Sequence, residues 1–283
     1  MHVLVAGCGW LGTALARALL ARGDRVTGVR RHPERAAELA ALGVAPLPLD
    51  LAAPDAAGGL PTDLDAVIAC QAAGGDGVEA YRRAYLEANQ SLLWAARRSG
   101  ARAFVYTGST GVFGQRDGSD VDEATPPAPS SPEAEVLVQA ERLVLGSGPA
   151  ARVVRLCGLY GPGRTGLLGR VRSGALALGP GDDAWMNFCH RDDAVSAVLA
   201  ALDRGRPAAI YHGSDAQPAR RREVVRWVSR ALGVEPVTRA EVGAARGAPN
   251  RRILSERTRA ELGLTLACPS FADGFGPLVV SAR

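Results

Sequence analysis

Lysine is absent from this sequence of 283 residues: all 33 residues counted as lysine or arginine are arginines. The absence excludes a Schiff-base lysine, a phosphate-binding loop of the Gly-Lys-Ser/Thr type, and any catalytic pair of lysine with tyrosine or serine. Each of these needs an ε-ammonium group that can lose a proton or fit a tight site. The missing residue type therefore limits the chemistry that this protein can perform.

Paired cysteines and long apolar runs are also lacking. The five cysteines are odd in number, widely spaced and without a C-x-x-C pattern, which favours buried free thiols over disulfides or a metal site. No apolar stretch approaches about 18 residues, and no cationic leader precedes the first apolar run. We therefore expect a cytoplasmic protein with no membrane segment and no metal.

No large excess of one charge is present, since 33 basic and 29 acidic residues leave a net charge of +4. The densest basic run, Arg220–Arg222 followed by Arg226 and Arg230, alternates with apolar residues. This pattern predicts the solvated face of an amphipathic helix. Because no nucleic-acid-binding motif accompanies it, we expect no nucleic-acid partner.

Short apolar runs alternate with segments of helical periodicity over the first part of the chain. Near-continuous apolar strands between helices indicate a parallel sheet that is covered on both faces. The sequence therefore predicts an α/β fold with a Rossmann-type doubly wound parallel sheet. The expected strands are 2–6, 25–29, 44–49, 66–70, 103–107 and 152–157, and the expected helices are 10–22, 34–42, 78–98 and 135–145.

The alternation weakens after residue 157, where glycine and proline become dense. We expect a dinucleotide-binding domain over 1–157 plus about 189–212, and a small, discontinuous substrate-binding lobe over about 158–188 plus 213–283. The loop over 115–132 is acidic and then proline-rich. Long loops of this kind in compact domains are often functional.

The sequence Gly7-Cys-Gly9-Trp-Leu-Gly12 fits the G-x-G-x-x-G pattern. It follows an expected strand and opens an expected helix, which is the context that dinucleotide binding needs. Gly7 would permit the tight turn, Gly9 the approach of the pyrophosphate, and Gly12 the close packing of helix on strand. Backbone N–H groups at the helix start, at Trp10 and Leu11, would then hold the diphosphate.

The choice of cofactor is determined at the end of the second strand. A carboxylate there would bind the ribose 2′-hydroxyl of NAD, but this chain has Arg30-Arg31 and no carboxylate before Glu34. A guanidinium group is suited to a 2′-phosphate. The sequence therefore predicts NADP(H) in preference to NAD(H), with two merely solvent-facing arginines as the alternative.

Several further motifs follow one another in a specific order. They lie at residues 49–51, 66–73, 89–97, 104–114, 155–163, 187–193, 211–215 and 250–253. Together with the glycine pattern, their order resembles that of the NAD-dependent epimerase/dehydratase family, the extended short-chain dehydrogenases/reductases. The resemblance runs from residue 2 to about 275.

The resemblance implies roles for individual residues in cofactor binding. Asp50 and Leu51 would lie beside the adenine. The cofactor's ribose and nicotinamide would be bordered by Gln71, Ala72 and Ala73.

The resemblance also implies a substrate site. Ser109 would be the catalytic hydroxyl that orients the carbonyl or alcohol of the substrate, and further contacts would come from Thr110, Tyr160 and Asn187. His190 and Asp193 resemble a structural pair. A homodimer through the helices 78–98 and 133–145 is implied as well.

The sequence departs from the family at its acid/base motif, Tyr-x-x-x-Lys. Counting back from Gln139-Ala-Glu141 places the two positions on Glu133 and Leu137, and neither residue can act as the tyrosine or the lysine. In the family, the ammonium group helps to bring the tyrosine pKa towards neutrality. Glu133 would be a substitute acid or base only if burial raised its pKa.

Two functions remain open. The first is an atypical NAD(P)-dependent oxidoreductase or epimerase (an isomerase) that uses Ser109 without the Tyr/Lys relay. Its substrate would be a small hydroxyl or carbonyl compound, or one like a sugar nucleotide. The second is a non-catalytic NADP(H)-binding protein with a regulatory or interaction role. The Ser109 hydroxyl and the retained lobe favour the enzyme.

Overall fold

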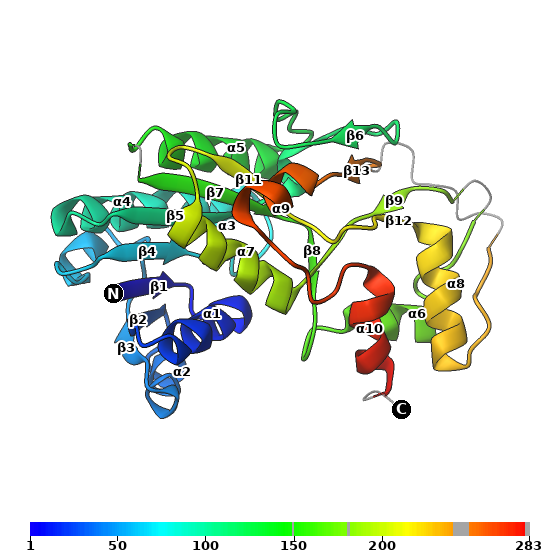
Figure 1. Ribbon diagram of the computed structural model, residues 1–283, viewed down its shortest axis with the longest axis horizontal. Helices are drawn as coiled ribbons and strands as arrows, with labels where there is room; N and C mark the ends of the chain where they lie inside the picture. The colour runs from blue at the N-terminus through cyan, green and yellow to red at the C-terminus, as the bar shows by residue number, and fades with distance from the viewer. Residues whose placement is uncertain (149, 180–181, 240–248, 281–283) are drawn as a thin grey trace. The chain divides into compact units, whose positions relative to one another are not determined.

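The computed structural model describes residues 1–148, 150–179, 182–239 and 249–280 (Figure 1). The first part of the chain alternates strands and helices, as predicted. Its elements are β1 (His2–Ala6), α1 (Trp10–Ala21), β2 (Arg25–Arg30), α2 (Pro33–Ala37), η1 (Ala40–Leu42), β3 (Ala45–Pro48), η2 (Ala56–Gly59), β4 (Ala66–Ala69), α3 (Val78–Tyr81), η3 (Arg82–Glu87), α4 (Ala88–Ser99), β5 (Ala103–Ser109) and η4 (Thr110–Val112).

The rest of the chain mixes short strands and helices less regularly. Its elements are β6 (Asp120–Val121), α5 (Pro132–Leu145), β7 (Ala151–Leu156), β8 (Gly158–Tyr160), α6 (Gly166–Arg172), β9 (Trp185–Met186), β10 (Phe188–His190), α7 (Arg191–Arg204), β11 (Ile210–Gly213), β12 (Ala219–Arg220), α8 (Arg221–Leu232), β13 (Arg252–Ile253), α9 (Glu256–Leu262) and α10 (Phe271–Val280). No helix in the described ranges is both long and apolar enough to cross a membrane.

A seven-stranded sheet has the order β11-β7-β5-β4-β1-β2-β3, and β1 pairs in parallel with both β2 and β4. The chain runs outward from β1 to β3 and then returns to β4 on the other side of β1. This reversal makes the gap between the carboxyl ends of β1 and β4 a topological switch point, where open α/β sheets bind ligands. The predicted doubly wound fold is confirmed.

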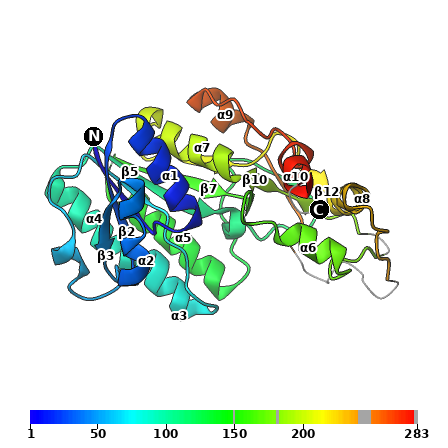
Figure 2. The same ribbon diagram turned by 90° about the horizontal axis from the view of Figure 1, so that it is seen from below.

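Helices cover both faces of this sheet, which explains why its central strands β1 and β4 are buried along their whole length. Figure 2 shows α1 and α7 on one side of the sheet and α4 and α5 on the other. One continuous core joins β1, β4 and β5 to α4 and α5. Strand β3 contains two prolines and lies at the sheet edge, where a strand tolerates residues without an N–H donor.

The predicted helix 78–98 is interrupted by η3, a π-helical segment between α3 and α4. The physical reason lies one residue into α4, where Nδ2 of Asn89 donates to the backbone carbonyl of Tyr85 at 2.8 Å. A side chain that takes the carbonyl four residues back competes with the regular helical hydrogen bond. The periodicity correctly predicts a helix here, but it does not predict the π-helical segment within it.

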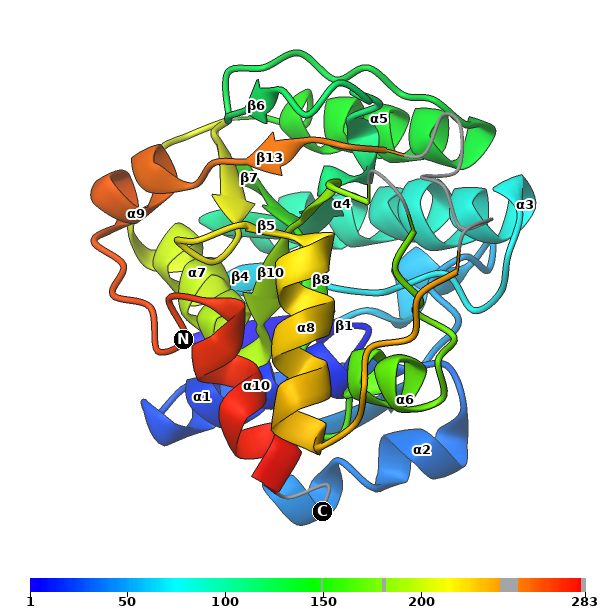
Figure 3. The same cartoon turned by 90° about the vertical axis from the view of Figure 1, so that its right-hand side faces the viewer.

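The chain divides into two compact units. The first comprises Met1–Phe113, Pro129–Arg155 and Val195–Tyr211, and the second comprises Gly114–Ala128, Leu156–Ala194 and His212–Arg283. Most of the loop 115–132, which the sequence analysis assigned to the dinucleotide-binding domain, falls in the second unit. That unit has its own core, in which α8 contacts both α6 and α10 (Figure 3).

Candidate functional site

The turn after β1 is closely packed and requires glycine. Gly7 has a φ of +75°, and a Cβ atom there would lie 2.3 Å from the backbone Cα of Gln71. A Cβ at Gly12 would lie 2.6 Å from the carbonyl oxygen of Gly7 and 3.1 Å from Sγ of Cys70. Both contacts are shorter than real Cβ atoms tolerate, so the first and third glycines permit the turn and the close approach of α1 to the sheet.

The middle glycine instead faces open space. Gly9 is exposed, and a Cβ there would meet only the carbonyl oxygen of Gly7, at 3.9 Å. Gly9 is also the N-cap of α1, and no side chain caps this helix, whose first turn begins with Trp10 and Leu11. A helix N-terminus with an open approach binds anions through backbone N–H groups. These residues fit the diphosphate of a dinucleotide.

Gln71 follows β4 at the other side of the switch point and is held by Asn89 of α4. Nε2 of Gln71 donates to Oδ1 of Asn89 at 3.1 Å, and Asn89 is fully buried. Oε1 of Gln71 is buried and has no partner among the described residues. A buried acceptor without a donor is unfavourable, so Gln71 presents an oxygen that a cofactor hydroxyl would satisfy.

Ala72 and Ala73 continue this segment beneath the π-helical turn. Ala72 is exposed, and the backbone N–H of Ala73 donates to the hydroxyl of Tyr85 at 3.4 Å. Tyr85 packs against the sheet core, and burial raises its pKa. Tyr85 therefore positions the segment and is not an acid that titrates near neutrality.

The two arginines at the end of β2 have different surroundings. The side chain of Arg30 is used by the protein itself: Nε donates to the carbonyl of Cys8 at 2.6 Å, and the other nitrogens reach Arg35, Glu38 and Thr13. The next side chain, Arg31, is exposed and makes no hydrogen bond or ion pair with the described residues. It is therefore free to bind a ligand.

Asp50 and Leu51 lie just after β3. Asp50 accepts a hydrogen bond from Arg83 at 3.0 Å and one from the backbone N–H of Ala52 at 3.1 Å, whereas Leu51 is buried. Asp50 thus has one oxygen fixed by the chain turn and the other paired at the surface.

Ser109 ends β5, and its Oγ accepts a hydrogen bond from the backbone N–H of Gly111 at 3.0 Å. Thr110, the next residue, is buried in η4. On α5, Glu133 is half-buried in the first turn, and Leu137 is buried one turn later. A Cβ at Gly111 would lie 3.5 Å from Leu137, so an apolar side chain stands beside the Ser109 turn.

A buried ion pair stiffens the strands behind Ser109, and the sequence did not reveal it. Nε and Nη2 of Arg155 donate to the two carboxylate oxygens of Glu141 at 2.9 and 2.7 Å, and both residues are buried. The guanidinium group also lies 4.9 Å from the ring centroid of Phe113. An arginine inside an apolar strand was the only available signal.

Tyr160 and Asn187 belong to the second unit and are engaged in its interior. The Tyr160 ring stacks on Phe275 at 4.2 Å, and burial raises the pKa of its hydroxyl. Nδ2 of Asn187 donates to the carbonyl of Arg251 at 3.0 Å, while its Oδ1 accepts from the N–H of Ile253 at 2.8 Å. Asn187 thereby anchors the strand β13.

The same unit buries an acid that the sequence analysis did not single out. Asp215 is 3% exposed, and neither of its carboxylate oxygens has a hydrogen-bond partner within the described part of the chain. Burial, with a smaller contribution from the neighbouring Asp193, raises the pKa of this carboxyl to about 7. Asp193 uses both its oxygens to accept the backbone N–H groups of Ala267 and Cys268.

The switch point, the open helix N-terminus and the glycine turn define a dinucleotide-binding protein of the Rossmann type. The sequence model of the NAD-dependent epimerase/dehydratase family matches residues 3–212 of the chain. The chain belongs to this family, as its motifs predicted.

The chain is similar to other known proteins over most of its length. It is 31% identical to a 3-diazoavenalumate denitrifying reductase from a Streptomyces species, over 98% of this chain and 99% of that protein. It is 32% identical to protein YeeZ of Escherichia coli K12, over 83% and 85%. A dTDP-glucose 4,6-dehydratase structure from Streptomyces venezuelae has the same fold, with a TM-score of 0.83 at 24% identity over 99% and 96% of the two chains.

Proposed function

We propose that this protein is an NADP(H)-dependent reductase that transfers hydride to a small acceptor without a Tyr/Lys relay. The observation that carries the proposal is the end of β2. There, a guanidinium group occupies the position where a carboxylate would bind the ribose of NAD, and Arg31 beside it is exposed and unpaired within the described residues. A 2′-phosphate would complement the charge of Arg31, since that of Arg30 is already paired with Glu38.

The cofactor's placement follows from residues of the first unit. The N–H groups at the start of α1 would hold the diphosphate, Asp50 and Leu51 would lie beside the adenine, and Oε1 of Gln71 would accept from a ribose hydroxyl. The bound cofactor supplies hydride. Ser109 would orient the acceptor through its hydroxyl, with Thr110 beside it as a further proposed contact.

The residues near Ser109 do not provide the family's proton donor. By motif spacing, the lysine position falls on Leu137, and burial raises the pKa values of Tyr85 and Tyr106 in this unit. An acceptor therefore either takes its proton from water or needs none. A diazonium group needs no proton, because hydride adds to its carbon while N2 leaves with the electrons of the broken C–N bond. The name of the Streptomyces relative points to such a substrate.

Single-turnover oxidation of bound NADPH tests the proposal. The acceptors are a panel of aldehydes, ketones, sugar nucleotides and an aryl diazonium salt. The loss of nicotinamide absorbance measures the oxidation of NADPH. We expect at least one acceptor to oxidise NADPH. We further expect Ser109→Ala to slow the oxidation by a carbonyl while leaving that by a diazonium nearly unchanged.

A non-catalytic NADP(H)-binding protein is the second candidate, and the loss of the relay at Glu133 and Leu137 favours it. Tight NADPH binding with no oxidation by any acceptor in the panel would support that function and reject the reductase. Substrate-dependent oxidation would reject the second candidate.

The choice of cofactor has its own test. Dissociation constants for NADPH and NADH, each measured at several salt concentrations, should favour NADPH most strongly at low salt, because the 2′-phosphate contacts are electrostatic. Equal constants for the two cofactors would contradict the preference.

The proposal extends to the protein's setting. A homodimer in the cytoplasm is proposed, and α4 carries a large exposed side chain, Trp94, at 45% exposure. Sedimentation of the purified chain and of Trp94→Glu tests the dimer: the first should be dimeric and the second monomeric.

A further inference from the structure

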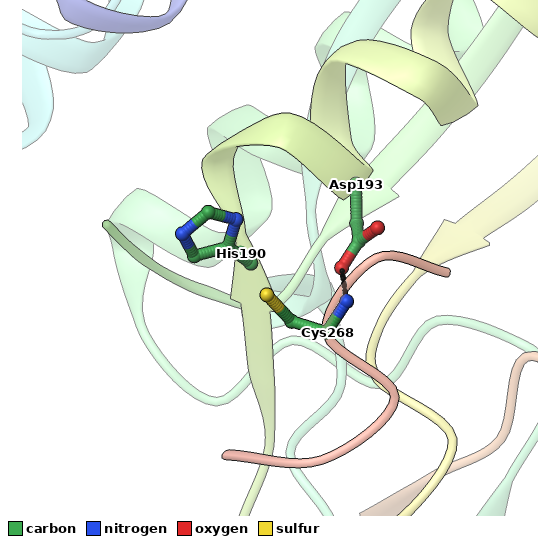
Figure 4. A group of neighbouring side chains, drawn as sticks. All are labelled: His190, Asp193 and Cys268. Carbon is green, nitrogen blue, oxygen red and sulfur yellow. Dashed lines mark hydrogen bonds between the residues drawn. The ribbon is translucent and has the colours of Figure 1, made fainter. Parts of the chain in front are cut away.

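Three potential metal ligands converge in the second unit, from segments far apart in the sequence. His190 ends β10, Asp193 lies in the first turn of α7, and Cys268 precedes α10 (Figure 4). One ligand atom from each lies within 4.8 Å of the other two. Because Asp193 and Cys268 are 75 residues apart, the cysteine spacing could not reveal this group.

The group is held in place by hydrogen bonds: Nδ1 of His190 accepts one from the backbone N–H of Asp192 at 3.3 Å, and Asp193 accepts two. Oδ1 of Asp193 accepts from the N–H of Ala267 at 2.7 Å, and Oδ2 accepts from the N–H of Cys268 at 3.0 Å. The carboxylate therefore fixes the backbone that carries the thiol. Each carboxylate oxygen has a second lone pair that can bind a cation.

The surroundings bury more negative than positive charge. Asp193 is 4% exposed and Asp215 3% exposed, and the two carboxyl groups interact. The positive charge of Arg259 lowers the pKa of Asp215, but neither carboxylate oxygen of Asp215 has a hydrogen-bond partner among the residues described. Buried acids are costly unless a cation compensates them. A bound dication would compensate both.

We propose that His190, Asp193 and Cys268 bind one Zn2+ ion, a site independent of the proposed reductase function. A nitrogen, a carboxylate oxygen and a thiolate are ligands that zinc accepts, at about 2.0–2.3 Å. Tetrahedral bonds of that length place the ligand atoms about 3.3–3.8 Å apart. The observed limit of 4.8 Å thus requires a closure of about 1.5 Å or less, and a water molecule would complete the coordination.

The same three residue types also occur in hydrolytic triads, but the geometry here differs. In a triad, the carboxylate orients the imidazole, whereas both oxygens of Asp193 accept hydrogen bonds from the backbone N–H groups of Ala267 and Cys268. Burial raises the pKa of Cys268 to about 11, with Asp193 as a further cause, so the free thiol is a weak nucleophile at neutral pH. A metal ion, by contrast, deprotonates a coordinating thiol.

The ion would join the segment before α10 to the end of β10 and the start of α7. Cys268 is only partly buried, which leaves a path for the ion to enter. A ligand that binds the folded state alone stabilises it. We therefore expect Zn2+ to raise the melting temperature of the second unit's core.

The test is calorimetric titration of the chelator-treated full chain with Zn2+, together with the absorption spectrum of its Co2+ complex. We expect one Zn2+ per chain and a sulfur-to-cobalt charge-transfer band. Cys268→Ala should abolish the band and weaken Zn2+ binding by more than about tenfold. Cys70→Ala is the matched control, because Cys70 is also partly exposed but lies in the first unit; it should keep both signals.

Three outcomes would overturn the site: no saturable Zn2+ binding, binding that Cys268→Ala leaves unchanged, or a Co2+ complex without a sulfur band. Because Asp193→Asn removes hydrogen bonds that hold the loop, His190→Gln serves as the second ligand variant. NADPH binding, measured on the same samples, reports on the proposed reductase separately.

Discussion

Removal of the Arg31 guanidinium should weaken the binding of NADPH and leave that of NADH nearly unchanged. Arg31 is exposed and makes no hydrogen bond or ion pair with the described residues, although its guanidinium group lies beside Gly74, so Arg31→Ala breaks no polar contact within the protein. A hydrogen bond to a charged group contributes about 1.5–3 kcal/mol, and solvent screening at an exposed site favours the lower end. Because 1.4 kcal/mol is tenfold, we expect the NADPH dissociation constant to rise by about tenfold.

Fluorescence titration with both reduced cofactors measures this difference directly. Arg35→Ala is the matched control: it removes the same charge from an exposed position on the neighbouring helix α2, and it should change neither constant by more than about twofold. Equal losses for NADPH and NADH in Arg31→Ala would refute the reasoning, as would no loss for NADPH. Equal losses would mean that Arg31 contacts a part that both cofactors share, and no loss would mean that it does not contact the cofactor.

Three further substitutions test other parts of the structure. Gly12→Ala forces a Cβ to 2.6 Å from a backbone oxygen, so both cofactors should bind at least about tenfold more weakly in fluorescence titrations; unchanged binding would contradict the packing. Glu141→Leu leaves the Arg155 guanidinium buried without its partner and should lower the free energy of unfolding by about 3–5 kcal/mol in urea titrations. A loss under about 1 kcal/mol would contradict the pairing. Asp215→Asn should stabilise the protein above pH 7 and not near pH 4. Since its folded pKa is raised from 3.8 to about 7, ionisation costs stability progressively between those values, by up to about 4 kcal/mol. A pH-independent effect in urea titrations would contradict the shift.

The doubly wound sheet was predictable because its signals are local. Apolar runs fix β1, β2 and β4, helical periodicity fixes α1, and the glycine pattern between β1 and α1 marks the switch point. Each signal lies within one element and its neighbour. The structure confirms these elements to within a few residues.

The contacts that complete the candidate site depend on pairs distant in sequence. Asn89 reaches Gln71 across 18 positions, and nothing near either residue indicates the pairing. The ion pair of Arg155 with Glu141 likewise joins a strand to a helix. Side-chain partners of this kind are set by tertiary packing, which periodicity and composition do not encode.

The proposed hydride transfer needs no proton relay on the enzyme. Its most direct measurement is the single-turnover rate of NADPH oxidation from about pH 6 to 9, with the best acceptor of the panel. The Asp215→Asn variant is used because it removes a carboxyl that titrates near pH 7. We predict a rate constant that varies by less than about twofold across this range. A sigmoidal or bell-shaped profile would contradict the claim, because it would reveal an enzyme group that gives or takes the proton.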